Sequence, residues 1–214
     1  MTYPGAFHHA MNRGYEGKPI FEPKGMKEFF LAMLEEHAPK FRLRIFSYSI
    51  MSNHHLVLEN SSGRMSDFFK QFNSKLASEY RKLVGGKGYV FQDRYKSTII
   101  QNEGYLMIVI AYTLNNPVRA KLAQNFLDYQ WSSASLHFNN QDESVIDTEF
   151  VEEIFGSKAN FVNFVHEWQT RKLPMIKTEE GLIIGGEEFH SNADKLQVRV
   201  LVNNFLAKKQ ENYL

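Results

Sequence analysis

The chain has 214 residues and a mass of 24.9 kDa, a length typical of one domain or of one domain with a small appendage. Apolar residues make up 43% of the chain and charged residues 23%, a composition that excludes wholesale disorder. There is no cysteine, which excludes disulfides, thiolate metal sites, iron–sulfur clusters and cysteine nucleophiles.

Charge is distributed unevenly along the chain, although the net charge is only +1. Residues 1–135 carry 17 Lys and Arg against 11 Asp and Glu, whereas residues 136–214 carry 8 against 13. A basic body with an acidic C-terminal part hints at a polyanionic partner, although ordinary variation along a chain would give the same asymmetry.

The sequence gives no sign of export or membrane insertion. The first residues have neither a basic region nor an apolar stretch of signal-peptide length. The longest apolar run, around Leu106 to Tyr112, is much shorter than the ~20 residues that cross a bilayer. We therefore expect a soluble, cytoplasmic protein with no membrane partner.

Hydrophobic periodicity predicts alternating strands and helices over the first 115 residues. The strongest helix pattern covers residues 65–83 and ends at Gly85-Gly86, and a later helix ends before Pro117. The predicted order is strand (7–14), helix (from 26), strand (41–50), strand (55–59), helix (65–83), strand (89–100) and helix (103–115). This order indicates an α+β fold, with helices packed on a small, mostly antiparallel sheet.

A polar connector over residues 139–147 separates this part, residues 1–138, from residues 139–214. Helical patterns follow at 148–155, 160–170 and 192–209, and a glycine-punctuated loop is expected at 181–186. We therefore predict two units, a main domain and an acidic, helical C-terminal extension.

Two groups of residues have the composition of a reactive site. Tyr112 and Asn116 lie four residues apart on a predicted helix, so their side chains share one face, although a core tyrosine with a capping asparagine would show the same spacing. His54 and His55 begin a predicted strand, where adjacent side chains point to opposite faces unless a bulge re-aims one of them. His8-His9 has no histidine at a suitable spacing.

A basic, aromatic segment adds a possible phosphate-binding surface. Arg94 and Lys96 alternate with Tyr95, a pattern suited to a nucleic-acid backbone and stacked bases, or to a solvated strand face. Arg13 adds one more positive charge at the end of the first strand.

These segments together resemble the tyrosine transposases that act on single-stranded DNA through a His-hydrophobic-His motif, particularly the REP-associated tyrosine transposase group. The blocks that carry the resemblance are Met11-Asn12-Arg13-Gly14, Met51-Ser52-Asn53-His54-His55-Leu56-Val57, Phe91-Gln92-Asp93-Arg94-Tyr95-Lys96-Ser97, Tyr112 to Ala120 and Trp131-Ser132-Ser133-Ala134. They follow the family's order over roughly residues 5–138.

The resemblance implies a ferredoxin-like antiparallel sheet flanked by helices, and strand cleavage and rejoining through a 5′-phosphotyrosine intermediate. It implies that Tyr112 is the nucleophile and that His54, His55 and Asn116 hold a divalent metal, Mg²⁺ or Mn²⁺. Arg13, Arg94, Lys96 and Arg119 would contact the DNA. The implied partner is single-stranded or hairpin DNA, and a homodimer is possible.

One departure from the family pattern concerns the histidines. The chain reads Asn-His-His-Leu where the family reads Asn-His-x-His-Leu. If the strand aligns from Leu56, His55 takes the second ligand position and Asn53 or His54 the first; if it aligns from Met51, His54 takes the first and Leu56 the second. A regular strand then presents one histidine to the metal, whereas a bulge restores both.

Three functions follow from this departure. The protein is a metal-dependent tyrosine transposase, or a catalytically impaired protein of the same fold that binds hairpin DNA. The third is a protein-interaction domain whose acidic C-terminal part is the contact surface.

Overall fold

A computed structural model describes residues 2–139, 144–178 and 181–186 of the chain. The predicted order of strands and helices is confirmed. The elements are β1 (Ala6–Asn12), α1 (Met26–Lys40), β2 (Leu43–Ile50), β3 (His54–Asn60), α2 (Met65–Val84), β4 (Lys96–Ile100), α3 (Glu103–Leu114), α4 (Asn116–Arg119), α5 (Thr148–Phe155), α6 (Lys158–Glu167), β5 (Met175–Thr178) and β6 (Gly181–Ile184).

The strands form one six-stranded sheet in the order β2-β3-β1-β4-β6-β5. Strands β2, β3, β1 and β4 pair antiparallel, which confirms the predicted ferredoxin-like sheet. Strand β6 pairs parallel to β4, and β5 pairs antiparallel to β6. The last two strands differ from the sequence prediction, which placed a loop at residues 181–186.

The strand predicted over residues 89–100 begins only at Lys96. The residues before it run as an irregular segment attached to the end of β1. The amide of Gln92 donates to the carbonyl of Arg13 at 3.0 Å, and that of Tyr15 donates to the carbonyl of Val90 at 2.8 Å. Two backbone hydrogen bonds therefore hold this segment beside β1 without a continuous ladder.

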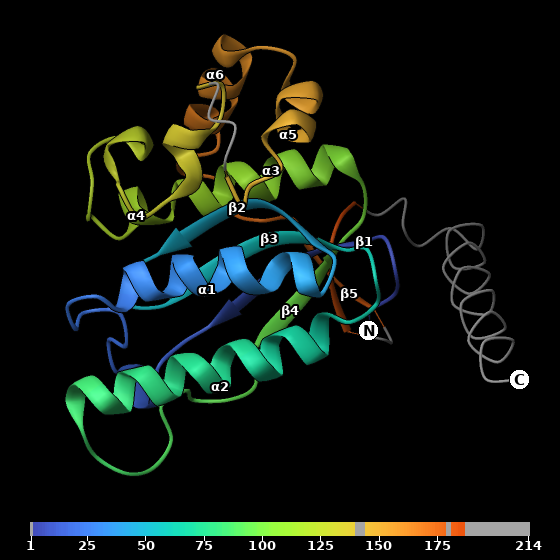
Figure 1. Cartoon of the computed structure of the whole chain (residues 1–214). Helices are drawn as coiled ribbons and strands as arrows, with labels where there is room; N and C mark the ends of the chain where they lie inside the picture. The colour runs from blue at the N-terminus through green and yellow to red at the C-terminus, as the bar shows by residue number, and fades with distance from the viewer. Residues whose placement is uncertain (1, 140–143, 179–180, 187–214) are drawn as a thin grey trace, which may run out of the picture.

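Helices cover both faces of the sheet (Figure 1). Helices α1 and α2 pack on one face, over a core that contains Phe30, Phe72 and Leu56. Helices α3, α5 and α6 pack on the other face, around Val57 and Val109. Because adjacent strand residues point to opposite faces, each central strand contributes side chains to both cores.

The C-terminal part of the described chain shares the second core. Val151 of α5 and Val165 of α6 are fully buried in the cluster that α3 forms with the sheet. The division into domains at residue 138 stays a prediction, and the helix predicted at 192–209 lies outside the described residues. Within the described part of the chain, no helix is both long and apolar enough to cross a membrane.

A buried amide fixes the end of α3 against α6. The Nδ2 of Asn115 donates to the carbonyl of Ala111 at 3.0 Å and to that of Val165 at 2.6 Å. Asn115 is 1% exposed, so both bonds are shielded from water. The helix turn that carries Tyr112 is therefore connected directly to the C-terminal helices.

Acid sensitivity follows from a histidine in this second core. His137 is buried against Phe161, and burial lowers its pKa to about 4 from an ordinary 6.5. Between pH 6.5 and 4 the unfolded chain binds a proton there that the native protein does not bind, so stability falls as pH falls. We expect His137→Leu to reduce the pH slope of the unfolding free energy by up to about 1.4 kcal/mol per pH unit.

The measurement is urea unfolding at a series of pH values between 7 and 4. His166→Leu, which removes an exposed imidazole from α6, is the matched control. Equal slopes for His137→Leu and the wild type would contradict the prediction.

Candidate active site

The two adjacent histidines of β3 point to opposite faces of the sheet. Strand β3 pairs with β1 without interruption from His54 to Asn60. The irregularity in its pairing with β2 lies on β2, between Ile45 and Ser47. No bulge therefore re-aims either histidine, and only one of them reaches the face that α3 covers.

His54 lies on the face that α1 and α2 cover. Its ring packs 4.9 Å from that of Phe30 and 5.7 Å from that of Phe21, centroid to centroid. It is fully buried, and neither ring nitrogen has a hydrogen-bond partner among the described residues. The structure therefore does not bring His54 together with Tyr112 or Asn116.

His55 lies on the face that α3 covers, where it meets a second histidine. The Nδ1 of His55 is hydrogen-bonded to the Nε2 of His9 on β1, at 3.1 Å. The two rings stack with centroids 5.2 Å apart and planes 16° apart. On its other side, the Nε2 of His55 lies 3.4 Å from the Nδ2 of Asn53.

Tyr112 faces this pair of imidazoles from α3. The ring of His9 stands edge-on to the ring of Tyr112, with centroids 6.1 Å apart. Tyr112 is half-buried, so its ring is held while part of its surface meets solvent. The tyrosine ring therefore contacts the His9 imidazole of β1, which in turn is hydrogen-bonded to the His55 imidazole of β3.

Arg119 also packs against the tyrosine. Its guanidinium carbon lies 4.0 Å from the centroid of the Tyr112 ring, and its Nη2 donates to the carbonyl of Tyr112 at 3.0 Å. Its Nη1 donates to the carbonyl of Gln169, after α6, at 3.5 Å. This arginine therefore fixes the tyrosine and places a positive charge next to the phenol ring.

Asn116 begins α4, four residues after Tyr112. It is 8% exposed, and its Nδ2 has no hydrogen-bond partner among the described residues. A buried amide without a partner is costly, so this side chain is available to a ligand.

Burial keeps both imidazoles uncharged at neutral pH. It lowers the pKa of His9 to about 4. It also lowers the pKa of His55 well below its ordinary value, and the nearby His9, His54 and Arg119 lower it further. Neutral imidazoles keep a lone pair on one ring nitrogen, the form in which histidine accepts protons or binds metals.

The strand register connects this site to the predicted DNA contacts. Met11 of β1 lies opposite His55 on one side and opposite Lys96 of β4 on the other. Residues directly opposite each other point to the same face, so these three side chains form one row across the sheet. At about 5 Å per strand, Lys96 begins roughly 10 Å from His55.

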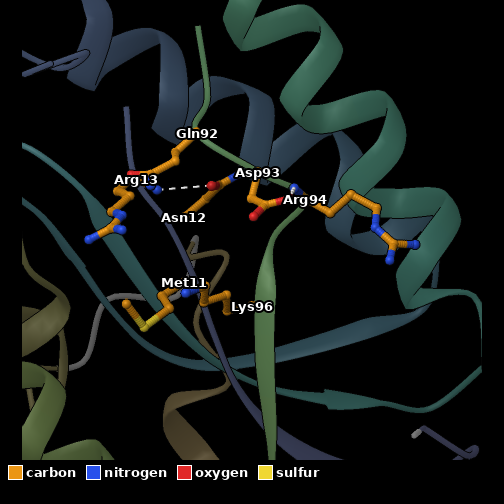
Figure 2. Close-up of a pocket in the computed structure, with 7 residues that line it drawn as sticks. All are labelled: Met11, Asn12, Arg13, Gln92, Asp93, Arg94 and Lys96. Atoms are coloured by element: carbon orange, nitrogen blue, oxygen red, sulfur yellow. Dashed lines mark hydrogen bonds between the residues drawn. The ribbon is translucent and has the colours of Figure 1, made fainter. Parts of the chain in front are cut away.

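A small pocket lies at this end of the sheet, between the end of β1 and the segment before β4. Figure 2 shows Arg13 and Arg94 on its two sides, with their guanidinium groups extending in opposite directions. Arg13, Arg94 and Lys96 are exposed, and none of them forms an ion pair within the described residues.

The pocket adjoins a larger groove of about 1060 Å³ between α2 and the segment at 89–97. Arg94 and Lys96 line both hollows, and α2 adds Lys70 and Arg81 to the groove. Tyr95 is stacked on Phe69 with ring centroids 4.0 Å apart, whereas Tyr89 is 82% exposed. The groove thus combines positive charge with aromatic faces, the combination that binds single-stranded nucleic acids.

The structure therefore gathers some predicted site residues and separates others. Tyr112 and Arg119 are in contact, and His55 joins them through His9, whereas Asn116 is placed only by its position four residues after Tyr112. Arg13, Arg94 and Lys96 lie at the end of the sheet. His9 and the α2 residues were not predicted. No local sequence pattern predicts the contact of His9 with His55, because the two residues are 46 positions apart and meet only through the pairing of β1 with β3.

A comparison with known families places this fold. The family model described as IS200-like transposase matches residues 5–116, which is more than half of the chain. The chain therefore belongs to the IS200-like transposase family.

Solved structures support the fold. A REP-associated tyrosine transposase bound to a REP hairpin superimposes with a TM-score of 0.52 at 12% identity, over 67% of this chain and 85% of that chain. The tRNA(His) guanylyltransferase of Saccharomyces cerevisiae gives a TM-score of 0.38 at 10% identity, over 86% of this chain and 92% of that chain. That score is too low to indicate a shared fold. Comparison with curated proteins gives no match.

The position of His54 gives a testable expectation. Leucine has a similar volume and would leave no polar atom unbonded among Phe21 and Phe30, so we expect His54→Leu to stabilise the protein by about 1–3 kcal/mol. Urea unfolding at pH 7.5 measures the change. A loss of stability, or release of a bound metal on substitution, would show that the imidazole has a role that its apolar surroundings do not reveal.

Proposed function

We propose that this protein binds single-stranded or hairpin DNA and cleaves and rejoins it with Tyr112 as the nucleophile. The observation that carries the proposal is that the Tyr112 ring contacts both the His9 ring and the Arg119 guanidinium. A tyrosine held only as core packing would not need contacts with a guanidinium and with an uncharged imidazole that is hydrogen-bonded to a second one.

In the reaction, the Tyr112 oxygen attacks the scissile phosphorus and forms a phosphotyrosine bond to the 5′ end of the downstream DNA fragment. The bond from phosphorus to the 3′ oxygen breaks, and that oxygen takes a proton to give a free 3′-hydroxyl. Rejoining reverses these steps with a second 3′-hydroxyl. Each step exchanges one phosphodiester for another, so the energy of the bond is conserved in the covalent intermediate.

The groups beside Tyr112 suit this chemistry. A phenol is protonated at neutral pH and must lose its proton to attack. Tyr112 is half-buried and part of its surface meets solvent, so water can carry that proton away. The charge of Arg119, 4.0 Å from the ring centroid, stabilises the developing negative charge.

The family resemblance implies a divalent metal, and the residues present fit one. His55 is neutral, and Asn116, four residues after Tyr112, carries an amide oxygen, the atom through which asparagine binds metal ions. These two side chains would hold the ion, which polarises the phosphate when bound. Within the described ranges no group of three His, Cys, Asp or Glu residues is gathered. An imidazole and an amide are both neutral ligands, and imidazole favours Mn²⁺ over Mg²⁺.

A second function is favoured by the position of His54. The family motif supplies two histidines to the metal, whereas here β3 turns one of its two away from Tyr112. If one histidine is too few for the ion, the protein binds hairpin DNA without cleaving it. The basic groove serves both functions equally, so DNA binding alone does not separate them.

A covalent adduct separates the two functions. We expect the wild-type protein, incubated with labelled hairpin DNA and Mn²⁺, to form a DNA adduct that survives a denaturing gel. Tyr112→Phe keeps the ring against His9 and Arg119 but has no nucleophile, so the adduct should disappear. A wild type that shifts the hairpin on a native gel but forms no adduct would favour the binding-only function.

The groove gives a separate expectation for affinity. Removing two phosphate contacts in Arg94→Ala/Lys96→Ala should weaken binding of single-stranded DNA roughly tenfold at physiological salt. It should reduce the slope of log affinity against log salt by about 1.4. Fluorescence anisotropy across a salt series measures both quantities.

The matched control for the groove variant is Lys158→Ala, which removes a positive charge from the start of α6 on the opposite side of the sheet. Equal losses in the two variants would point to a general charge effect, and the groove would then not be the binding surface.

A further inference from the structure

We propose that His9 supplies the second imidazole of the metal site, so that the histidine pair is built across two strands, from β1 and β3, and not within one motif. The role of the metal in cleavage rests on the proposed function. The binding of the metal by His9 and His55 does not, because it can be measured without DNA.

Strand geometry allows a histidine on β1 to take the place of a second histidine on β3. Two residues separated by one position on a strand share a face, about 6.6 Å apart along the chain. Diagonal neighbours on two antiparallel strands lie about 7–8 Å apart on the same face. His9 lies opposite Val57, and His55 lies opposite Met11, so His9 and His55 are such diagonal neighbours. A histidine on β1 therefore occupies nearly the distance from His55 that a histidine two residues away on β3 would have.

The observed contact places the two rings within reach of one ion. The Nε2 of His9 and the Nδ1 of His55 are 3.1 Å apart. Bonds from first-row metal ions to imidazole nitrogen are about 2.0–2.1 Å long, so both nitrogens can reach the same ion after a small adjustment. Without the ion, the two nitrogens share one proton in a hydrogen bond. This bond gives both buried ring nitrogens a partner, and buried polar atoms without a partner are costly.

The neighbouring side chains complete the site. The amide of Asn53 lies 3.4 Å from the Nε2 of His55 and orients that ring. Tyr112 contacts the His9 ring, and so an ion held by His9 and His55 would lie beside the nucleophile. The alternative partner, His54, contacts two phenylalanines on the other face and cannot take part.

A nearby positive charge and the neutral ligands affect how strongly the site binds an ion. Arg119 is close enough to lower the pKa of His55. The described residues around the pair contribute neutral ligands, which leaves a bound divalent ion its full positive charge for a phosphate. This arrangement favours an ion that binds firmly only when the phosphodiester is also present, so affinity for the ion alone should be modest.

The test measures Mn²⁺ binding to the whole chain without DNA, by the electron paramagnetic resonance signal of free Mn²⁺. His9→Phe retains a ring against Tyr112 but has no ligating nitrogen. We expect it to weaken Mn²⁺ binding more than about tenfold, as His55→Phe does, whereas His54→Leu binds as the wild type does. Wild-type affinity in a folded His9→Phe variant would overturn the proposal, and so would a wild type that binds no better than His55→Phe.

A second measurement needs no variant. In wild-type protein with ¹⁵N-labelled histidine, Zn²⁺ as a diamagnetic probe should shift ring nitrogens of both His9 and His55. His8 and His54, which precede them in the chain and face the other side of the sheet, are internal controls. Shifts at His55 without shifts at His9 would overturn the proposal.

The two proposals fail separately. A covalent adduct at Tyr112 together with unchanged Mn²⁺ binding in His9→Phe would reject the cross-strand pair and leave the function standing. Mn²⁺ binding by His9 and His55 with no adduct on any hairpin would reject the cleavage function and leave the metal site standing.

Discussion

Side-chain alternation along β3 is the constraint on which the rest of the site depends. Because β3 pairs with β1 without a bulge, its adjacent histidines face opposite cores. One of them, His54, becomes a packing residue among phenylalanines, and the other, His55, faces α3 and is hydrogen-bonded to His9, whose ring contacts Tyr112. Any second imidazole on the tyrosine's face has to come from another strand, and the register of β1 provides it in His9.

The C-terminal part of the chain holds the tyrosine in place. Asn115 joins the end of α3 to the carbonyl of Val165 in α6, and Arg119 reaches the carbonyl of Gln169 just after that helix. Both contacts lie within seven residues of Tyr112, on the turns that aim its ring. Losing α6 would therefore affect the position of the nucleophile as well as the second core, so the acidic region contributes to the site through packing even though it supplies none of the proposed ligands.

The sequence predicted the fold well where local signals decide it. The amphipathic helix at 65–83, the end of α3 before Pro117 and the order of strands and helices along the chain follow from periodicity and from residues that stop helices. The segment at 89–95 was wrongly predicted as strand, because its β-branched and aromatic residues serve a groove and not a ladder. Strands β5 and β6 were missed because two four-residue strands leave almost no periodicity to detect.

The candidate site was predictable only where spacing along one element determines it. Tyr112 and Asn116 share a helix, so their i, i+4 relation is readable from sequence. The contact between His9 and His55 depends on the register of two strands joined by a helix and a third strand, which no local pattern records. Arg119 was predicted as a DNA contact from the resemblance alone, and its position over the tyrosine ring required the turn between α3 and α4.

The proposed DNA binding and the proposed cleavage lie in two different environments on one sheet, the groove and the site beside Tyr112. The groove is wet and carries charged residues that form no ion pairs within the described residues, a setting in which phosphate contacts are strong only at low salt. The site beside Tyr112 is largely dry, and its imidazoles are uncharged, so a single positive charge has a larger effect there. Met11 links the two, since it lies opposite both His55 and Lys96 in the sheet. A DNA strand bound in the groove, on the face that α2 covers, would have to pass around the end of the sheet at Arg13, Arg94 and Lys96 to reach the tyrosine on the face that α3 covers. Salt should weaken its capture far more than the reaction that follows.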